Sequence, residues 1–408
     1  MQYGIGKDKQ RGAVSLFIVI FSALLITTIT VAFVRIMVQN QQQATTIDLS
    51  KSALDSAYAG VEDAKRVIVD YQTNNCSNTS EGTKEKKDVC KSLADVLAAV
   101  SNQECNTIQE SGIFPGLTGE KEVIVEQKEL GGDDQLLQQA YTCVKIKMDT
   151  LDYEGKLIAN ETRMIQLKSN KTFNKVRINW FVAEDLQTEL SGGASTGPTL
   201  PENALLPKLS SPSATVWPKD SPPLIRTQLI QFGDKFQLSD FDDNVGKKTN
   251  NATLFLIPSK RDGLGGVPFS FADNKRKSKN QVPSQPVEIK CEENFDNRFA
   301  CSATVGVPDM IGSGTKTAYL LLSAIYNTGT TFSVEMLQGN TVVSFDGIQP
   351  EVDSTGRAND LFRRVKSRVE TGVSSIPPVE AAVDISGSLC KAFYITASDY
   401  RQLNSCSN

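Results

Sequence analysis

The side chains that could carry out chemistry are cysteines and carboxylates, because the chain contains no histidine. The lack of histidine removes the commonest general base, the Ser-His-Asp and Cys-His catalytic systems, and the commonest zinc ligand. Catalysis would then rest on a pair of carboxylates, as in a cell-envelope hydrolase, with two acidic residues facing each other across a cleft. No such arrangement stands out in the sequence, so we expect the protein not to be an enzyme.

The eight cysteines are the second chemical feature. They show no C-x-x-C spacing, so zinc-ribbon and thioredoxin chemistry has no support. All follow the N-terminal apolar segment, which fits an oxidising, extracytoplasmic compartment with paired disulfides, whereas the alternative is a cytosolic protein with buried free thiols. Cys291 and Cys301 could staple a hairpin, and Cys390 and Cys406 could close a C-terminal loop. The other four allow three connectivities: Cys76, Cys90, Cys105 and Cys143.

Three polar clusters resemble binding motifs but lack the spacing that those motifs require. The run GSGTKT at 312–317 lacks the G-x-x-x-x-G-K-[ST] spacing of a phosphate loop, so it predicts a turn. The acidic run at 240–244 lacks the spacing of a calcium loop, so it predicts a solvated turn. The basic run at 275–279 has no interleaved aromatic residue, and the net charge is −4. We therefore expect no bound metal or cofactor and no nucleic-acid partner.

These groups must be positioned by the elements that follow an N-terminal apolar segment. From Ala13 to Val34 the chain has no charged residue, Gly or Pro, and this length is close to the ~20 residues that span a bilayer as a helix. The leader, residues 1–12, is net positive, so the positive-inside rule keeps it in the cytoplasm and exports the rest. A secretory signal peptide would have a shorter apolar run and a small-x-small cleavage site. The sequence therefore predicts a single-pass transmembrane helix at 13–34.

The helix is predicted to continue outside the membrane over residues 35–71. Only Gly60 interrupts this stretch, and we expect it to be tolerated at a modest cost. Apolar and small residues recur every seven positions and predict a narrow seam covered by other elements. The alternative is a plain anchor followed by a separate helix, with the joint at 39–43. The seam residues are Ile47, Leu54, Val61 and Ile68, with Ser50, Ala57, Ala64 and Tyr71 three positions later.

The N-terminal region is similar to that of PilX-type minor pilins, within the type IV pilin and pseudopilin family. The similarity lies in a basic leader ending in Gly12, the apolar run RGAVSLFIVIFSALLITTITVAF, and the small-residue run SALDSAYAGVEDA that follows. The resemblance implies cleavage between Gly12 and Ala13, N-methylation of Ala13, and packing of the helix in a filament core. Phe17 stands where major pilins carry Glu, which favours a minor, initiating or tip subunit over a bulk subunit.

The resemblance also implies partners and a location. The partners are membrane lipid, other pilin subunits and the pilus assembly machinery, with a surface ligand for the exported head. The implied role is a structural subunit for filament assembly and surface adhesion, anchored in the cytoplasmic membrane with its head outside, or present on the pilus or cell surface. The alternative is a single-pass surface binding protein, an adhesin that stays outside any filament. The residues implied in filament packing are Ala13, Phe17, Ala23, Leu54 and Val61.

Beyond the helix the sequence predicts an α+β head followed by a β-rich module. Residues 72–190 are expected to form a pilin-like head whose antiparallel sheet buries the helical seam. Residues 191–223, rich in Pro, Ser and Gly, predict a linker or surface loop. Residues 224–408 predict a sandwich-like module of short strands. The expected helix lies at 88–100 and the expected strands at 122–128, 141–148, 164–167, 176–182, 224–232, 252–257, 317–326, 331–337 and 361–369.

Overall fold

The structure, a computed structural model, divides the chain into two compact units. The first unit comprises Met1–Ile146 and Val352–Ser367, and the second comprises Lys147–Glu351 and Arg368–Asn408. The residues that the structure describes are 11–74, 76, 84–101, 117–119, 122–128, 137–158, 161–186, 197–200, 217, 220–232, 251–260, 287–312, 317–326 and 329–370.

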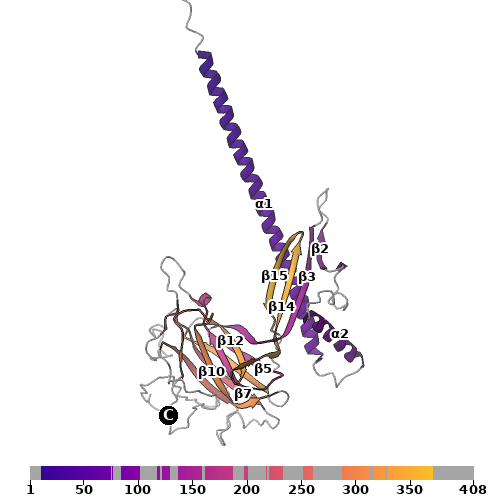
Figure 1. Ribbon diagram of the computed structural model, residues 1–408, viewed down its shortest axis with the longest axis vertical. Coiled ribbons are helices and arrows are strands. Elements are labelled where there is room, and N and C mark those ends of the chain that lie inside the picture. Colours follow the sequence, from indigo (N-terminus) through magenta and orange to yellow (C-terminus); the bar gives the residue numbers. More distant parts are fainter. Residues whose placement is uncertain are drawn as a thin grey trace, which may run out of the picture. The chain divides into compact units, whose positions relative to one another are not determined.

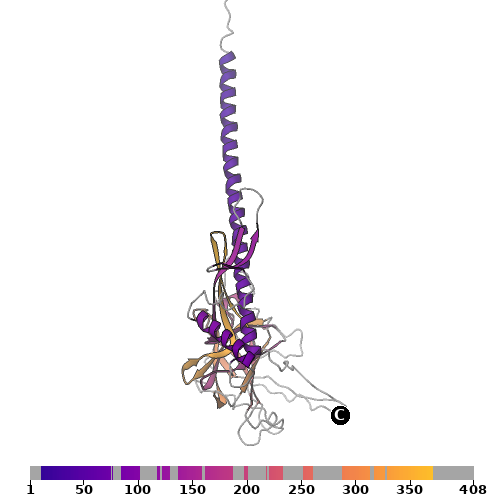
Figure 2. The same ribbon diagram turned by 90° about the vertical axis from the view of Figure 1, so that its right-hand side faces the viewer.

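The first unit is built on one uninterrupted helix, α1, which runs from Arg11 to Thr73 over 63 residues. At about 1.5 Å per residue its length is on the order of 95 Å. Residues 39–43 are helical, so the single-helix prediction is confirmed and a joint at that point is wrong. Helix α2 (Lys84–Ser101) lies beside the C-terminal end of α1 (Figures 1 and 2), where the disulfide between Cys76 and Cys90 ties the two helices together.

A five-stranded sheet in the order β1-β2-β3-β14-β15 packs along the C-terminal half of α1 (Figure 1). Strands β1 and β2, and β2 and β3, pair antiparallel. A two-residue turn with Asn359 at φ 50° joins β14 to β15, and asparagine is one of the few residues that tolerate this backbone conformation. The predicted pilin-like arrangement of helix on sheet is confirmed. The strands are β1 (Leu117–Gly119), β2 (Glu122–Lys128), β3 (Leu137–Thr150), β14 (Phe345–Ala358) and β15 (Leu361–Arg368).

The face of α1 that the sheet covers differs from the predicted seam. Ile47 and Leu54 lie outside the covered face and are exposed, so that part of the seam prediction is wrong. The physical reason is that an undistorted α-helix drifts by about 20° per heptad relative to a strict seven-residue repeat. The buried face therefore follows spacings of three and four residues instead. Its members are Ala53, Ser56, Ala57, Gly60, Val61, Ala64, Val67 and Ile68.

The second unit contains two five-stranded sheets that share one apolar core. One sheet has the order β10-β6-β12-β13 with β4 paired to β12, and the other has the order β5-β11-β7-β8-β9. Large side chains such as Trp180, Phe173 and Phe332 are fully buried between them. A sandwich-like module is therefore confirmed, but it also includes β4, β5 and β6, which come from the segment predicted as the pilin-like head. The elements are β4 (Asp152–Ile158), β5 (Thr162–Leu167), β6 (Phe173–Trp180), η1 (Ala183–Asp185), β7 (Leu224–Phe232), β8 (Asn251–Ser259), β9 (Val287–Lys290), β10 (Cys301–Ile311), β11 (Thr317–Ile325), β12 (Gly329–Gln338) and β13 (Thr341–Val343).

The segment 191–223, predicted to be a linker or a surface loop, does not separate the two units. Strand β6, which precedes that segment, pairs with β10 and β12, which follow it. Within the segment, Leu200 is part of the sandwich core, and Ser221 Oγ donates a hydrogen bond to the carbonyl of Thr199. Its proline-rich composition suits a covering segment of one unit as well as a linker, so composition could not tell the two apart.

Predicted strands agree with the structure within a few residues, and β2 and β7 have the predicted bounds. Strands β1, β4, β9, β10, β13 and β14 were not predicted. The disulfide between Cys291 and Cys301 is confirmed, and Cys76–Cys90 belongs to one of the three open connectivities. The side chains of Cys105, Cys143, Cys390 and Cys406 lie outside the described residues, as do residues 240–244, 275–279 and 313–316.

Candidate functional site

The N-terminal part of α1 is apolar on every side and is covered by nothing in its own unit. The helix is long and apolar enough to cross a membrane by length and composition, with a mean hydropathy of 2.6 over its most apolar window. Phe17, at the position where major pilins carry Glu, is 66% exposed. This surface needs lipid or other protein around it, because large exposed apolar areas mark membrane or protein contacts.

Hydroxyl groups in this apolar stretch are satisfied within the helix itself. Serine and threonine side chains donate to backbone carbonyls three or four residues earlier, which removes unpaired donors from a dry environment. The stretch can therefore sit in lipid or against other helices without leaving these groups unpaired. The donor–acceptor pairs are Ser22–Val19, Thr27–Ala23, Thr28–Leu24 and Thr30–Ile26, at 2.8–3.0 Å.

Further along α1, the sheet holds the helix through a contact between small residues. A Cβ atom added to Gly356 of β14 would overlap the carbonyl oxygen of Ala53 and the amide nitrogen of Ala57. A Cβ atom added to Gly60 of α1 would overlap Ser354 Oγ and approach the ring of Tyr141 to 3.0 Å. The backbones of strand and helix thus approach more closely than side chains would allow. Gly60 is required by this contact, which corrects the prediction that it is merely tolerated.

Polar contacts fix the same sheet against the helix. The hydroxyl of Tyr141 donates to Asp63 Oδ2 at 2.7 Å, and burial, followed by this carboxylate, raises the pKa of Tyr141 far above its usual value. Arg357 donates through two nitrogens to the carboxylate of Glu122. Such a bidentate pair is among the stronger ion pairs because its geometry is fixed. The Tyr141–Asp63 contact therefore joins β3 to α1, whereas the Arg357–Glu122 pair joins β14 to β2 within the sheet.

A second ion pair stands on the outer side of the sheet. Arg364 of β15 donates through two nitrogens to Asp353 of β14. The hydrogen bond from Arg364 lowers the pKa of Asp353, so this carboxylate stays ionised to lower pH than usual. The pair links the two strands of the hairpin that covers the helix, and it lies at the surface, where ion pairs contribute little to stability.

The side of α1 that is turned away from the sheet keeps an apolar stripe beyond the membrane-length segment. Ile47 is 47% exposed, Leu54 is 37% exposed and Tyr58 is 52% exposed. Their spacings of seven and four residues place them along one side of the helix. This stripe, Ile47–Leu54–Tyr58, is separated from the apolar surface of residues 15–38 by the polar stretch at 39–43. It is a surface on which another helix can pack.

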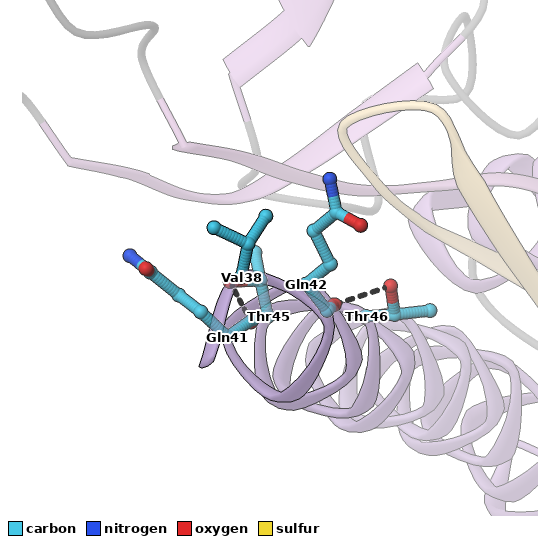
Figure 3. A pocket seen from close by; sticks show the side chains of 5 residues that line it. All are labelled: Val38, Gln41, Gln42, Thr45 and Thr46. Carbon is cyan, nitrogen blue, oxygen red and sulfur yellow. Dashed lines mark hydrogen bonds between the residues drawn. The ribbon is translucent and has the colours of Figure 1, made fainter. Parts of the chain in front are cut away.

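A shallow depression of about 530 Å³ lies between these two regions of α1 (Figure 3). The hydroxyls of Thr45 and Thr46 are bonded to the carbonyls of Gln41 and Gln42, while the two amide side chains point away from the helix axis (Figure 3). One apolar residue and four polar ones offer no convergent set of groups for a small ligand. The lining residues are Val38, Gln41, Gln42, Thr45 and Thr46.

The residues implied in processing and filament packing lie in different environments. Gly12 and Ala13 are in the first turn of α1. The structure does not describe the environment of their side chains. Phe17 and Ala23 are exposed, whereas Val61 is buried inside its own unit. Sequence reasoning placed Ala57 in the seam but missed Ala53 and the requirement for Gly60 in the contact with β14. The available signal was the run of Ala, Ser and Gly at three- and four-residue spacing between 53 and 64.

Among the described residues, no group of three or more His, Cys, Asp and Glu side chains could hold a metal ion. The outer face of the sandwich carries polar side chains that bond to one another instead. Asn179 donates to Ser333 Oγ at 3.0 Å, and Ser302 donates to Asn179 Oδ1 at 2.7 Å. These groups therefore satisfy one another's hydrogen-bonding capacity.

Comparison with known proteins identifies no relative. No family model matches the sequence, no curated protein matches it, and no solved structure matches the fold. The pilin-like character of the first unit therefore rests on its helix-on-sheet architecture and on the N-terminal sequence.

Proposed function

We propose that this chain is a membrane-anchored, minor pilin-like structural subunit that serves the assembly of a type IV pilus or a related filament. The observation that carries the proposal is that α1 has exposed apolar surface in two places. One is the membrane-length segment. The other is the stripe Ile47–Leu54–Tyr58, which follows the polar stretch at 39–43 and lies beyond any hydrocarbon layer that the first segment could span. A plain anchor has no need of such a stripe outside the membrane, whereas a helix that packs against neighbouring helices does.

Phe17 supports a minor role over a bulk one. In major pilins the Glu at this position neutralises the terminal amine of a neighbouring subunit, and a chain without it leaves that amine unpaired in an apolar surrounding, which is costly. A subunit that initiates, caps or decorates a filament makes this contact once or not at all. The proposed partners are membrane lipid, other pilin subunits and the assembly machinery, and the proposed role is structural rather than enzymatic.

Intact-mass measurement of the protein purified from membranes tests the proposal. The expected mature protein begins at Ala13 and carries one N-terminal methyl group. Substitution Gly12→Leu should block processing and leave the full-length chain, while the matched change Gly6→Leu in the same leader should leave processing intact. A wild-type protein that still begins at Met1 in cells with an active prepilin peptidase would contradict the proposal.

The surface-adhesion part of the role falls on the second unit, and an adhesin that stays outside a filament is the second candidate. The observation that favours it is the size of the sandwich, which has its own core and exposes a polar sheet face. Deletion of the gene separates the two candidates. Loss or shortening of filaments supports the minor-subunit role, whereas unchanged filaments with reduced surface attachment support the adhesin.

A further inference from the structure

The strands that cover the helix come from a distant part of the chain. The buried face of α1 lies at residues 53–68, whereas the hairpin that contacts it, formed by the ends of β14 and β15, lies at residues 352–367. The residues on either side of this hairpin, Glu351 and Arg368, belong to the second unit. The first unit is therefore incomplete until a hairpin carried by the second unit has joined it.

The base of this hairpin is held by the fold of the second unit. Gln349, which is buried, donates to the carbonyl of Glu154 at 2.6 Å and accepts from the amide of the same residue at 2.8 Å. On the other side of the hairpin, Arg368 donates to Asp152 at 2.8 Å. Glu154 and Asp152 both lie in β4, which pairs with β12. The base is thus in place only when these sandwich strands have formed.

The entropic cost of loop closure favours folding of the second unit before docking of the hairpin onto α1. If the second unit is unfolded, contact between Gly60 and Ser354 closes a loop of almost the whole exported chain, and the entropic cost of closure rises with loop length. If the second unit is folded, its own pairings already hold the base of the hairpin, and only short segments remain to be ordered. The hairpin buries no large apolar side chain of β14 against α1, because the buried residues of its part of β14 are Val352, Ser354, Gly356 and Ala358. The apolar area that it buries is therefore smaller than that of the aromatic core of the second unit.

We infer that residues 352–367 act as a clasp that closes over α1 as the last folding step, so that docking of the helix waits for a folded second unit. Because of the clasp, the helix-and-sheet unit is complete only in chains whose second unit has folded. This inference concerns folding order and goes beyond the proposed function. It holds whether or not residues 1–12 are removed and whether or not the chain enters a filament.

Pulsed hydrogen exchange with mass spectrometry on the full chain, refolded in detergent micelles with its disulfides intact, tests the order directly. Peptides covering β6 and β12 report on the second unit, and peptides covering 352–367 report on the clasp. In the wild type we expect protection of β6 and β12 first and protection of the clasp severalfold later. Protection of the clasp before β6 would overturn the inference.

Three full-length variants sharpen the test. Gly356→Val should abolish clasp protection while β6 gains protection at the wild-type rate. Gln349→Met removes the hydrogen bonds to Glu154. It should slow protection of the clasp severalfold, while the rate at which β6 gains protection should stay within about twofold of the wild type. Trp180→Ala should delay β6 and the clasp by the same factor, or leave both unprotected if the second unit fails to fold. A clasp that becomes protected while β6 does not would refute the dependence.

Discussion

The two units hold their parts together by opposite means. In the first unit, a strand and a helix approach until their backbones nearly touch, at Gly356, Ala53 and Ala57. In the second unit, two sheets are kept apart by the volume of buried aromatic side chains, among them Trp180 and Phe332. Small residues therefore have the same structural importance in one unit that large residues have in the other.

The difference predicts opposite sensitivities to mutation. A core filled by large side chains loses stability when volume is removed, because a cavity and lost contacts remain. A contact made by glycine and alanine loses stability when volume is added, because the surrounding backbone cannot move aside. Substitutions that shrink or enlarge one residue in each unit can therefore test the comparison.

The largest effect is expected from Trp180→Ala in the sandwich. Trp180 is fully buried and its indole nitrogen donates to the carbonyl of Pro223 at 3.1 Å, so the change removes both volume and a hydrogen bond. We expect the free energy of unfolding of the second unit to fall by about 3–5 kcal/mol. Denaturant unfolding of the full chain in micelles measures it.

Trp217 provides the matched control for this change. It is only half-buried, stacks on Tyr326 with ring centroids 5.2 Å apart, and lies outside the main core. Trp217→Ala should therefore cost clearly less than Trp180→Ala. Equal costs for the two variants would mean that burial in the sandwich core does not set the stability of this unit.

The next effect is expected from Gly356→Val in the first unit. Its side chain would overlap the backbone of α1 at Ala53 and Ala57, so the clasp must move away from the helix. We expect a loss of about 3 kcal/mol from the contact between clasp and helix, at the upper end of overpacking costs. The neighbouring change Thr355→Val, on the strand face turned away from α1, serves as the control, and protease susceptibility near residues 53–68 is the readout.

This contrast also explains what the sequence could and could not predict. The long helix, β2, β7 and the Cys291–Cys301 pair followed from hydrophobic pattern and cysteine spacing, as the structure confirms. Strand β14 did not, because its helix-facing side is made of Val352, Ser354, Gly356 and Ala358. These small residues lack the apolar alternation by which strands are recognised.

The clasp region of the candidate site was hidden for the same reason, together with its distance along the chain. Local patterns reveal which residues favour a strand, but not that residues near 354 pair with residues near 60. The apolar character of the N-terminal part of α1, by contrast, depends only on local composition and can be read from the sequence. Recognition of the helix-contacting glycines required knowledge of both partners, Gly60 in α1 and Gly356 in β14.

A smaller effect on the free energy of unfolding is expected when the pH is raised. Burial, followed by the nearby Glu370, raises the pKa of Tyr153 from its ordinary value of 10.0 to about 12. Because the folded state holds this proton more tightly, the corresponding stability is complete below pH 10 and is lost as pH rises toward 12. The loss should amount to roughly 2.7 kcal/mol. The unfolding midpoint measured between pH 9 and 12 should fall less steeply in Tyr153→Phe, while the exposed control Tyr58→Phe should follow the wild type.

The smallest expected effects are increases in the free energy of unfolding, one from a substitution in each unit. Ser354 Oγ and Thr227 Oγ1 are both buried without a hydrogen-bond partner among the described residues, and such groups retain an uncompensated desolvation cost. Ser354→Ala in the clasp and Thr227→Val in the sandwich should each raise the free energy of unfolding by about 1 kcal/mol. Thermal unfolding of the full chain checks both.

A double-mutant cycle then separates the two kinds of packing. Because Ser354 Oγ is the nearest atom to a Cβ on Gly60, Gly60→Ala should cost less in the Ser354→Ala background than in the wild type. The same Gly60→Ala change should be additive with Thr227→Val, since residues in separate units without shared partners do not couple. A coupling energy near zero for Gly60 and Ser354 would mean that the closeness of helix and strand does not limit the first unit, and the contrast between the two units would fail.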